Sequence, residues 1–208
     1  MPGRFITFEG IDGAGKSTHI EAVAAHLREG GRAVVSTREP GGTQLAEALR
    51  YLVLHAPMDS LTETLLIFAA RRDHVANLIA PSMARGDVVL CDRFTDATEA
   101  YQGAGRGVDG NWIRALAGIA HPGLDPDLTI VFDVPATVAN ERLALRGARQ
   151  DRIEAEDAGF FQRVRTAYLD IAVREPGRVR VVDATRPEAD VAASVAALLD
   201  AALAAEPR

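Results

Sequence analysis

One stretch, residues 4 to 20, constrains this chain more than any other, and it reads RFITFEGIDGAGKSTHI. Its opening apolar run with a β-branched threonine predicts a buried strand, and the apolar spacing after Lys16 predicts an amphipathic helix. The loop between them matches GxxxxGK[ST] at every fixed position, with Gly10, Gly15, Lys16 and Ser17. The alternative is a glycine-rich turn with a chance lysine, which the flanking strand and helix disfavour. The stretch therefore predicts a phosphate-binding loop.

The residue types of this loop explain what it can bind. Glycines let the backbone curl so that successive N–H groups point at phosphate oxygens, and the helix N-terminus adds partial positive charge. Lys16 supplies a mobile charge for the β- and γ-phosphates, and the hydroxyl of Ser17 is placed for Mg²⁺. The loop thus indicates a nucleoside triphosphate, but it leaves open whether the phosphoryl group goes to water, a protein or a small molecule.

The composition limits the class of protein. A chain of 208 residues, 48% hydrophobic and 25% charged, suits one globular domain spanning residues 1–208. The net charge of −6 argues against nucleic acid or an anionic membrane as the main partner. The single cysteine, Cys91, excludes an intrachain disulfide and is expected to be a buried thiol. With no leader-like segment and no apolar run long enough to span a membrane, we expect a cytoplasmic protein.

Predicted strands and helices alternate along the chain. After the first strand and helix, further strands are expected at 33–37, 87–91, 128–134 and 178–183. Helices are expected at 44–55, 61–83, 111–120, from about 136, at 157–172 and at 187–204. This alternation predicts an α/β fold in three layers, with a five-stranded parallel sheet flanked by helices and joined by right-handed crossovers.

Charged residues follow two of the predicted strands. Ligands of open α/β sheets bind just outside the carboxyl ends of strands, which makes Arg38, Glu39, Asp92 and Arg93 candidates for the site. An acid there is placed for Mg²⁺ or its water shell, and Arg93 offers a second phosphate clamp. For residues 38–43 a solvated turn remains the alternative, with Thr43 able to cap the next helix.

The long helix carries an arginine in line with its apolar stripe. That stripe comprises Leu61, Leu65, Phe68, Val75 and Ile79, and helical spacing places Arg72 among them. A guanidinium on a core face needs an anionic partner. Phe68, one turn earlier, could stack on a flat ring while Arg72 bonds the ring's edge, although a plain core role for Phe68 is the alternative. Arg71 and Asp73 are expected on the solvated flank.

Two polar segments and one aromatic residue complete the candidates. The segment FTDATEAYQGAGRG holds Tyr101 and Gln102, which could read a base edge or a sugar, or belong to a capped surface helix. The basic segment RGARQDRIE, about 146–156, is expected to be a lid that brings arginines onto the transferring phosphate; a solvated helical face is the alternative. Trp112 is expected to be a packing residue.

Taken together, these motifs resemble the thymidylate kinase family of nucleoside monophosphate kinases, in its bacterial form. The resemblance covers residues of about 5 to 173 and rests on FEGIDGAGKST, TREPGGT, FAARR, DRF, AYQGAGR and RIE. It implies direct phosphoryl transfer from Mg²⁺-ATP to dTMP, giving dTDP for dTTP biosynthesis. It also implies a homodimer, for which the helix surface near 61–83 or Trp112 could serve.

The resemblance further implies roles for particular residues. ATP would contact the loop residues Gly10, Ile11, Asp12, Gly13, Ala14, Gly15, Lys16, Ser17 and Thr18. The nucleotide dTMP would contact Asp12, Glu39, Pro40, Phe68, Arg72, Arg93, Thr98, Tyr101 and Gln102. Catalysis would involve Asp12, Lys16, Arg93 and Arg149, and the metal would lie near Ser17 and Asp92. Tyr101 would pack against the deoxyribose and disfavour a 2′-hydroxyl.

One position departs from part of the family. Some members carry an arginine directly after the acid of the phosphate loop, and here that position is Gly13. The transition-state cation is then expected from the lid, among Arg146, Arg149 and Arg152, with Arg149 the first choice.

Two other functions stay open on the residues alone. A different acceptor, such as dUMP, another nucleoside monophosphate or a nucleoside, would use the same phosphate loop. A nucleotide-dependent switch would be expected to carry a guanine-selecting motif such as NKxD, and the sequence contains none.

Overall fold

A five-stranded parallel sheet forms the centre of the molecule in the computed structural model, which describes residues 3–146 and 151–204. The strand order is β2-β3-β1-β4-β5, and every neighbouring pair is parallel. The strands are β1 (Arg4–Glu9), β2 (Val34–Arg38), β3 (Val88–Asp92), β4 (Leu128–Asp133) and β5 (Val179–Asp183). The predicted α/β fold with a five-stranded parallel sheet is thus confirmed.

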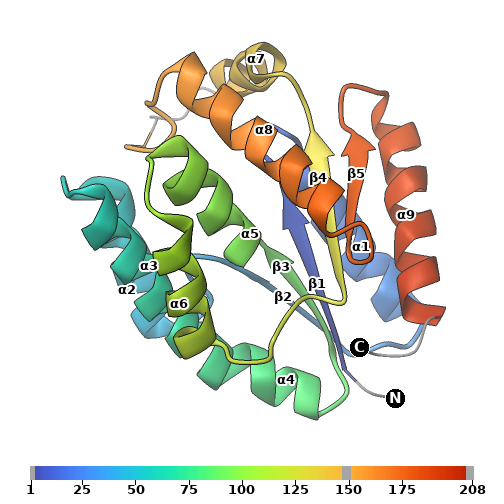
Figure 1. The fold of residues 1–208 in the computed structure, drawn as a ribbon. Coiled ribbons are helices and arrows are strands. Elements are labelled where there is room, and N and C mark those ends of the chain that lie inside the picture. The colour runs from blue at the N-terminus through green and yellow to red at the C-terminus, as the bar shows by residue number, and fades with distance from the viewer. Residues whose placement is uncertain (1–2, 147–150, 205–208) are drawn as a thin grey trace.

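Helices cover both faces of this sheet (Figure 1). They are α1 (Lys16–Glu29), α2 (Gln44–His55), α3 (Ser60–His74), α4 (Ala80–Ala84), α5 (Thr95–Thr98), α6 (Gly110–Ala120), α7 (Ala136–Arg146), α8 (Ala158–Arg174) and α9 (Glu188–Ala204). Two π-helical segments, η1 (Val75–Ile79) and η2 (Glu99–Gly105), continue α3 and α5. Helices α2, α3 and α6 pack together on one side of the molecule, and α1 and α9 pack together on the other.

The core follows from the burial of the central strands. All six residues of β1 are buried, as expected where helices cover both faces of a parallel sheet. Cys91 lies fully buried in β3, so the expectation of a buried thiol is confirmed. The expectation for Trp112 is wrong, because this side chain is 53% exposed. Helix α6 instead turns Ile113 and Ala120 inward, where they pack with Phe68.

The helix predicted at 61–83 forms as one run of α3, η1 and α4, but its inward face differs from the predicted stripe. Leu61 and Leu65 are exposed, whereas Arg71 is 1% exposed. The expectation that Arg71 lies on a solvated flank is therefore wrong. The buried positions of α3 include Glu63, Thr64, Arg71 and His74, so polar residues occupy much of its inward face. Phe68, Val75 and Ile79 of the predicted stripe are buried, so the prediction is confirmed for these three residues and wrong for Leu61 and Leu65.

The topology brings three loops to one edge of the sheet. Strands β1, β2 and β3 are neighbours, and Phe8 and Arg38 both pair with Asp92 in the sheet register. The phosphate loop, the turn at 38–43 and the residues after β3 therefore emerge side by side. Thr43 caps α2 by accepting the N–H of Ala46, as predicted.

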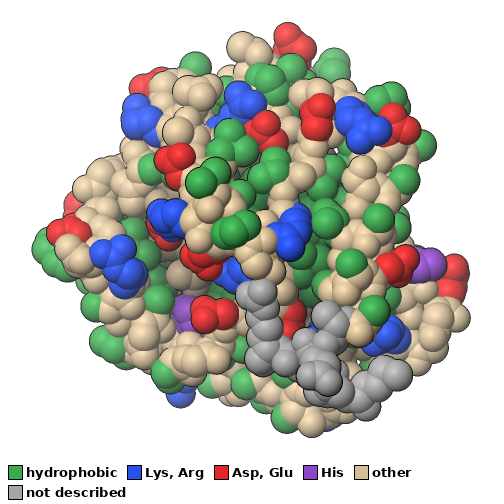
Figure 2. All heavy atoms as spheres, turned by 45° about the vertical axis from the view of Figure 1, so that its right-hand side comes forward, with side chains coloured by type: hydrophobic (Ala, Val, Ile, Leu, Met, Phe, Trp, Pro, Cys, Tyr) green, Lys and Arg blue, Asp and Glu red, His purple; other side chains and the backbone are tan. Residues whose placement is uncertain are grey.

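The surface charge is mixed, and no described helix suits a membrane span. Lysine and arginine are interspersed with acidic side chains on the face that Figure 2 shows. Within residues 3–146 and 151–204, no helix is long and apolar enough to cross a membrane.

Candidate functional site

The phosphate loop curls between β1 and α1 with glycine at its sharpest points. Gly10, Gly13 and Gly15 all have positive φ, a conformation that side chains disfavour. At Gly13 a Cβ atom would also lie 2.4 Å from the carbonyl oxygen of Ala139. The glycines are thus required by backbone geometry and by close packing against α7.

Lys16 lies at the start of α1 and bends back over the loop. Its Nζ donates to the carbonyl oxygens of Gly10 at 3.2 Å and Ile11 at 3.4 Å, and it lies 3.9 Å from Oδ1 of Asp92. Burial, and then the charge of Arg93, lower the pKa of Lys16. An anionic ligand at the loop would oppose this effect by adding negative charge beside the buried amine.

A polar hollow of about 1270 Å³ opens in front of this loop and is called the P-loop cleft here. The phosphate loop contributes every residue from 12 to 18 except Ala14 to the lining of this cleft. The other lining residues are Arg38, Glu39, Arg50, Asp92, Arg93, Arg142, Asp151 and Glu154. Arg142 of α7 also lines an adjoining hollow beside Gly15 and Thr18. The cleft combines open backbone with several cations, which suits a polyphosphate.

Arg93 is held at the centre of the site by four hydrogen bonds. Its Nη1 donates to the carbonyl oxygen of Gly10 and to the hydroxyl of Tyr168, and its Nη2 donates to Asp12 and to the hydroxyl of Tyr101, all within 3.1 Å. Its backbone adopts the left-handed region with φ 72°, which is strained for a residue with a side chain. Burial by itself would lower the pKa of Arg93, but the charges of Asp12 and of the groups around it together outweigh burial and raise that pKa.

Asp12 forms the other half of this arrangement. Its two carboxylate oxygens accept from Arg93 at 2.8 Å and from the hydroxyl of Tyr101 at 3.0 Å. Burial by itself would raise the pKa of Asp12. The charges of Arg93 and Lys16, with the hydrogen bonds from Arg93 and Tyr101, outweigh burial and lower that pKa to about 2. Asp12 is therefore ionised at neutral pH and orients both the guanidinium and the phenol.

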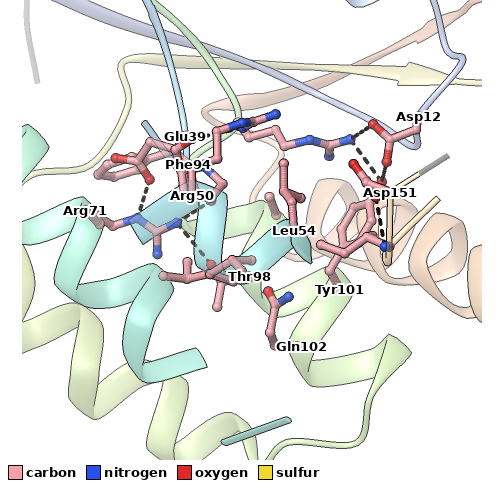
Figure 3. A pocket seen from close by; sticks show the side chains of 16 residues that line it. Asp12, Glu39, Arg50, Leu54, Arg71, Phe94, Thr98, Tyr101, Gln102 and Asp151 are labelled. Carbon is pink, nitrogen blue, oxygen red and sulfur yellow. Dashed lines mark hydrogen bonds and ion pairs between the residues drawn. The ribbon is translucent and has the colours of Figure 1, made fainter. Parts of the chain in front are cut away.

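A second hollow, of about 560 Å³, lies between α2, α3 and the α5–η2 segment and is called the apolar pocket here (Figure 3). Its apolar wall consists of Pro40, Val53, Leu54, Ile67, Phe94, Ala97 and Ile153. It shares Asp12, Glu39, Arg50, Arg93 and Asp151 with the P-loop cleft. The two hollows therefore meet at Asp12 and Arg93, so that two ligands could be brought end to end there.

Arg71 provides a buried cation in the wall of the apolar pocket. Its Nε donates to Glu39 at 2.6 Å, and its Nη2 donates to the carbonyl oxygen of Phe94 and the hydroxyl of Thr98, both at 3.0 Å. Its Nη1 is buried and has no hydrogen-bond partner among the described residues. A buried donor of this kind is costly unless a ligand acceptor meets it.

Glu39 is engaged by this arginine and by one histidine. Its second oxygen lies 2.9 Å from Nδ1 of His74. Burial by itself would raise the pKa of Glu39, but the charges and hydrogen bonds of Arg71 and His74 together outweigh burial and lower that pKa. Glu39 thus lines both hollows, and both of its oxygens face these two partners.

The predicted pair Phe68 and Arg72 lies elsewhere. Phe68 is buried behind Arg71, with the guanidinium carbon 4.8 Å from the ring centre, and it does not line the apolar pocket. Arg72 is exposed and donates to the carbonyl oxygen of Ala120 at 3.3 Å. The placement of Arg72 on the core face is therefore wrong, because the inward arginine is its neighbour Arg71.

The structure brings the other predicted residues together. Pro40, Thr98, Tyr101 and Gln102 all line the apolar pocket. Of the residues predicted at the P-loop cleft, Gly10, Ile11 and Ala14 form the loop backbone, and the rest, Ser17 and Asp92 among them, line the cleft directly.

Sequence reasoning missed two arginines of the site. Arg50 of α2 lines both hollows and donates to the carbonyl oxygen of Pro40 at 2.9 Å. Arg142 of α7 lines the P-loop cleft and donates to the carbonyl oxygen of Ala184 at 2.9 Å. For Arg50 a signal was available, since α2 begins directly after the TREPGGT turn. For Arg142 there was none, because only the packing of α7 beside the loop places it.

The lid residues are only partly described. Arg149 and the side chain of Arg146 lie outside the described residues. Arg152 donates twice to the carbonyl oxygen of Val53, at 3.2 and 2.8 Å, and once to the buried carboxylate of Glu63. In this conformation Arg152 therefore packs against α2 and α3 beside the apolar pocket, with its guanidinium directed to Val53 and Glu63.

The residues beside Lys16 fit a magnesium ion. Oδ1 of Asp92 is buried and has no hydrogen-bond partner within the described part of the chain, while Ser17 presents a hydroxyl to the same cleft. Hard oxygen ligands of this kind, few in number, are what Mg²⁺ takes from a protein when phosphates supply the rest.

Comparisons with known proteins agree with this geometry. The model of the family described as "Thymidylate kinase" matches residues 8–195. A thymidylate kinase of Cupriavidus pinatubonensis is 59% identical over 189 residues, covering 89% of this chain and 92% of that protein. One of Bordetella petrii is 55% identical over 200 residues, covering 96% of both. The crystal structure of thymidylate kinase from Ehrlichia chaffeensis superposes with a TM-score of 0.78 at 38% identity, covering 96% of this chain and 99% of that one. The chain belongs to the thymidylate kinase family.

Proposed function

We propose that this chain transfers the γ-phosphoryl group of ATP to the phosphate of dTMP, giving ADP and dTDP for dTTP synthesis. The observation that carries the proposal is the meeting of the P-loop cleft and the apolar pocket at Asp12 and Arg93. A polyphosphate in the cleft and a nucleoside monophosphate in the pocket would place donor and acceptor phosphates against each other there. The whole chain would act as a single kinase domain.

Catalysis by this site rests on positive charge and positioning. The nucleophile is already an anionic phosphate oxygen, so a general base adds little, and the obstacle is repulsion between two anions. Lys16 and Arg93 would neutralise that charge from the phosphate loop and from the end of β3. Arg50, between the two hollows, adds a third cation. Because Asp12 and Tyr101 hold Arg93 before substrate binds, its reorganisation cost is small.

The apolar pocket would hold the nucleoside of dTMP. We assign the contact with the base edge to Arg71 rather than Arg72, because Arg71 lines the pocket and its buried Nη1 has no hydrogen-bond partner among the described residues. Phe68 would support this guanidinium from behind, and Ile67 and Phe94 would pack against the base. Tyr101 would lie against the deoxyribose and disfavour a 2′-hydroxyl.

The metal and the lid complete the proposal. Ser17 and Asp92 would hold Mg²⁺, which would neutralise charge on the ATP phosphates. Arg142, beside Gly15, would contact ATP from the adjoining hollow. Arg149 remains our first choice for the arginine that reaches the transferring phosphate from the lid, since Arg152 is engaged by Glu63.

We further propose that the enzyme is a cytoplasmic homodimer. Large apolar side chains are exposed on the packed group of α2, α3 and α6, namely Leu45, Leu52, Leu61, Leu65, Trp112 and Ile119. Exposed apolar side chains on helices that pack against one another favour association. Light scattering of the wild-type protein and of Leu65→Asp would test it, because a dimer formed through this surface is expected to dissociate in the variant.

The activity is tested by ADP release with Mg²⁺-ATP against dTMP, dUMP, dCMP, dAMP, dGMP, UMP, thymidine and no acceptor. We expect a strong rate with dTMP, a weaker rate with dUMP and rates near background for the others. An equal rate without acceptor would show an ATPase or a switch and would refute the roles given to Arg71 and Tyr101. A preference for another acceptor would retain the kinase activity and change the substrate.

A further inference from the structure

Glu63 is a fully buried carboxylate that the reaction proposed above does not use. It lies in the first turn of α3 with 0% exposure and does not line the apolar pocket. Its Oε1 accepts from Nε2 of Gln102 at 2.7 Å and from Nε of Arg106 at 2.8 Å. Its Oε2 accepts from Arg152. An acid buried this deeply, with three donors converging on it, fixes the groups that it binds.

Glu63 fixes the orientation of the side-chain amide of Gln102. A carboxylate between two guanidinium groups offers only acceptor atoms, so Gln102 must turn its NH₂ group toward Glu63. Its Oε1 is then the atom left for the pocket, and within the described residues it makes no hydrogen bond. Figure 3 shows the side-chain amide of Gln102 reaching into the pocket below Thr98. A carboxamide that could flip freely would present either a donor or an acceptor; here only the acceptor is available.

Arg71 supplies the complementary atom. Arg71 lines the same pocket, and its buried Nη1 is a donor without a hydrogen-bond partner among the described residues. The pocket thus presents one fixed donor and one fixed acceptor to the ring that enters it. A carbonyl beside a ring N–H, the O4 and N3 edge of thymine or uracil, matches both. Cytosine carries an amino donor and an unprotonated ring nitrogen on that edge and would mismatch both.

We propose that Glu63 is a specificity-determining positioning residue: by fixing the direction of the Gln102 amide, it makes the pocket select thymine over cytosine. This inference rests on the proposed use of the apolar pocket as a dTMP site. It assigns base discrimination in part to a residue that touches no substrate.

The test is the ratio of kcat/KM for dTMP to kcat/KM for dCMP, measured on the full chain. In Glu63→Gln, position 63 can donate as well as accept, so the Gln102 amide can flip. We expect the ratio to fall by about tenfold or more, because a mispaired buried polar group costs roughly 1–3 kcal/mol. The matched control is Glu156→Gln, which removes another carboxylate from Arg106 at 2.8 Å without touching Gln102. For Glu156→Gln, the ratio of kcat/KM for dTMP to kcat/KM for dCMP is expected to stay within about threefold of the wild-type value.

A swap variant keeps the test independent of the stability of Glu63→Gln. In Glu63→Gln/Gln102→Glu, the amide at 63 donates to the carboxylate at 102, whose other oxygen is again an acceptor for the pocket. Its ratio is expected to recover to near the wild-type value. An unchanged ratio in a folded Glu63→Gln, an equal fall in Glu156→Gln, or a swap variant without recovery would each overturn the inference. Absence of dTMP turnover in the wild type would instead refute the proposed function itself.

Discussion

Exchanging Arg71 for lysine, with Arg72→Lys as the control, separates two neighbouring residues that the sequence alone confuses. Both substitutions preserve charge and change one side chain on the same helix. Within the described part of the chain, Arg71 has three hydrogen bonds to protein and one buried donor without a partner. Arg72 is exposed and makes one bond, to the carbonyl oxygen of Ala120. The two variants are therefore expected to differ widely.

The magnitudes follow from the bonds that lysine cannot make. One amine cannot serve Glu39, the carbonyl oxygen of Phe94 and Thr98 at once, so Arg71→Lys is expected to lose at least two bonds, about 1 kcal/mol each. Loss of the charged donor to a base carbonyl would cost a further ~1.5–3 kcal/mol in the complex. That corresponds to a fall of roughly 10- to 150-fold in kcat/KM for dTMP. Arg72→Lys is expected to change stability by no more than about 0.5 kcal/mol.

The assay combines urea unfolding with kinetics at varied dTMP and saturating ATP. Unfolding shows how much of the Arg71→Lys effect is structural, and the KM for ATP shows whether the P-loop cleft is intact. We expect kcat/KM for dTMP to fall in Arg71→Lys while the KM for ATP stays within about threefold. If Arg72→Lys loses more kcat/KM than Arg71→Lys, the assignment of the base contact to Arg71 is wrong.

Three further predictions follow from the same structure. Gly42→Ala is expected to lower the free energy of unfolding by about 1–3 kcal/mol, because Gly42 has φ +88° and a Cβ atom there would lie 2.4 Å from His74. Urea unfolding checks this prediction, and an unchanged unfolding midpoint would contradict it. Burial and then the charge of Asp96 raise the pKa of Glu9 to about 8, above its value near 4.5 in the unfolded chain. Between these two values folded Glu9 keeps a proton that the unfolded chain releases. The contribution of Glu9 to stability is therefore lost as the pH rises from about 5 through 8. Glu9→Gln should remove that fall, which unfolding at pH 6 and pH 8.5 would show as a smaller difference than in the wild type. Arg142→Ala is expected to raise the KM for ATP by about tenfold and leave the KM for dTMP unchanged, and an equal rise in both would refute a role confined to the donor side.

Much of the fold was accessible from sequence because its signals are local. The phosphate loop is a run of consecutive residues whose glycines and lysine have separate physical reasons. The alternation of apolar strands with amphipathic helices predicts a parallel sheet, and that topology places the ends of β1, β2 and β3 together. Lys16, Asp92 and Arg93 could therefore be named from the ends of the predicted strands, and Asp12 from the family resemblance. The strand order that makes them neighbours came from the structure.

The inward face of α3 was decided only by tertiary packing. The apolar spacing of Leu61 and Leu65 predicted one face, but these side chains are exposed on the packed group of α2, α3 and α6. A charged residue can be buried when partners from distant segments meet it. Arg71 is buried because Glu39 and Thr98 accept its hydrogen bonds, and Glu63 is buried because Gln102 and Arg106 donate to it.

The phosphate loop, the α/β fold and the kinase family can be read from short contiguous patterns in the sequence. Tertiary packing is what places Arg71 rather than Arg72 at the pocket, brings Arg50 and Arg142 to the site and holds Gln102 against Glu63. These depend on contacts between residues far apart in the chain, such as Glu63 with Arg152, and no local pattern records them. The physical reason is that hydrophobic spacing reports where apolar groups gather, whereas the burial of a charge depends on the partners that the fold brings to it.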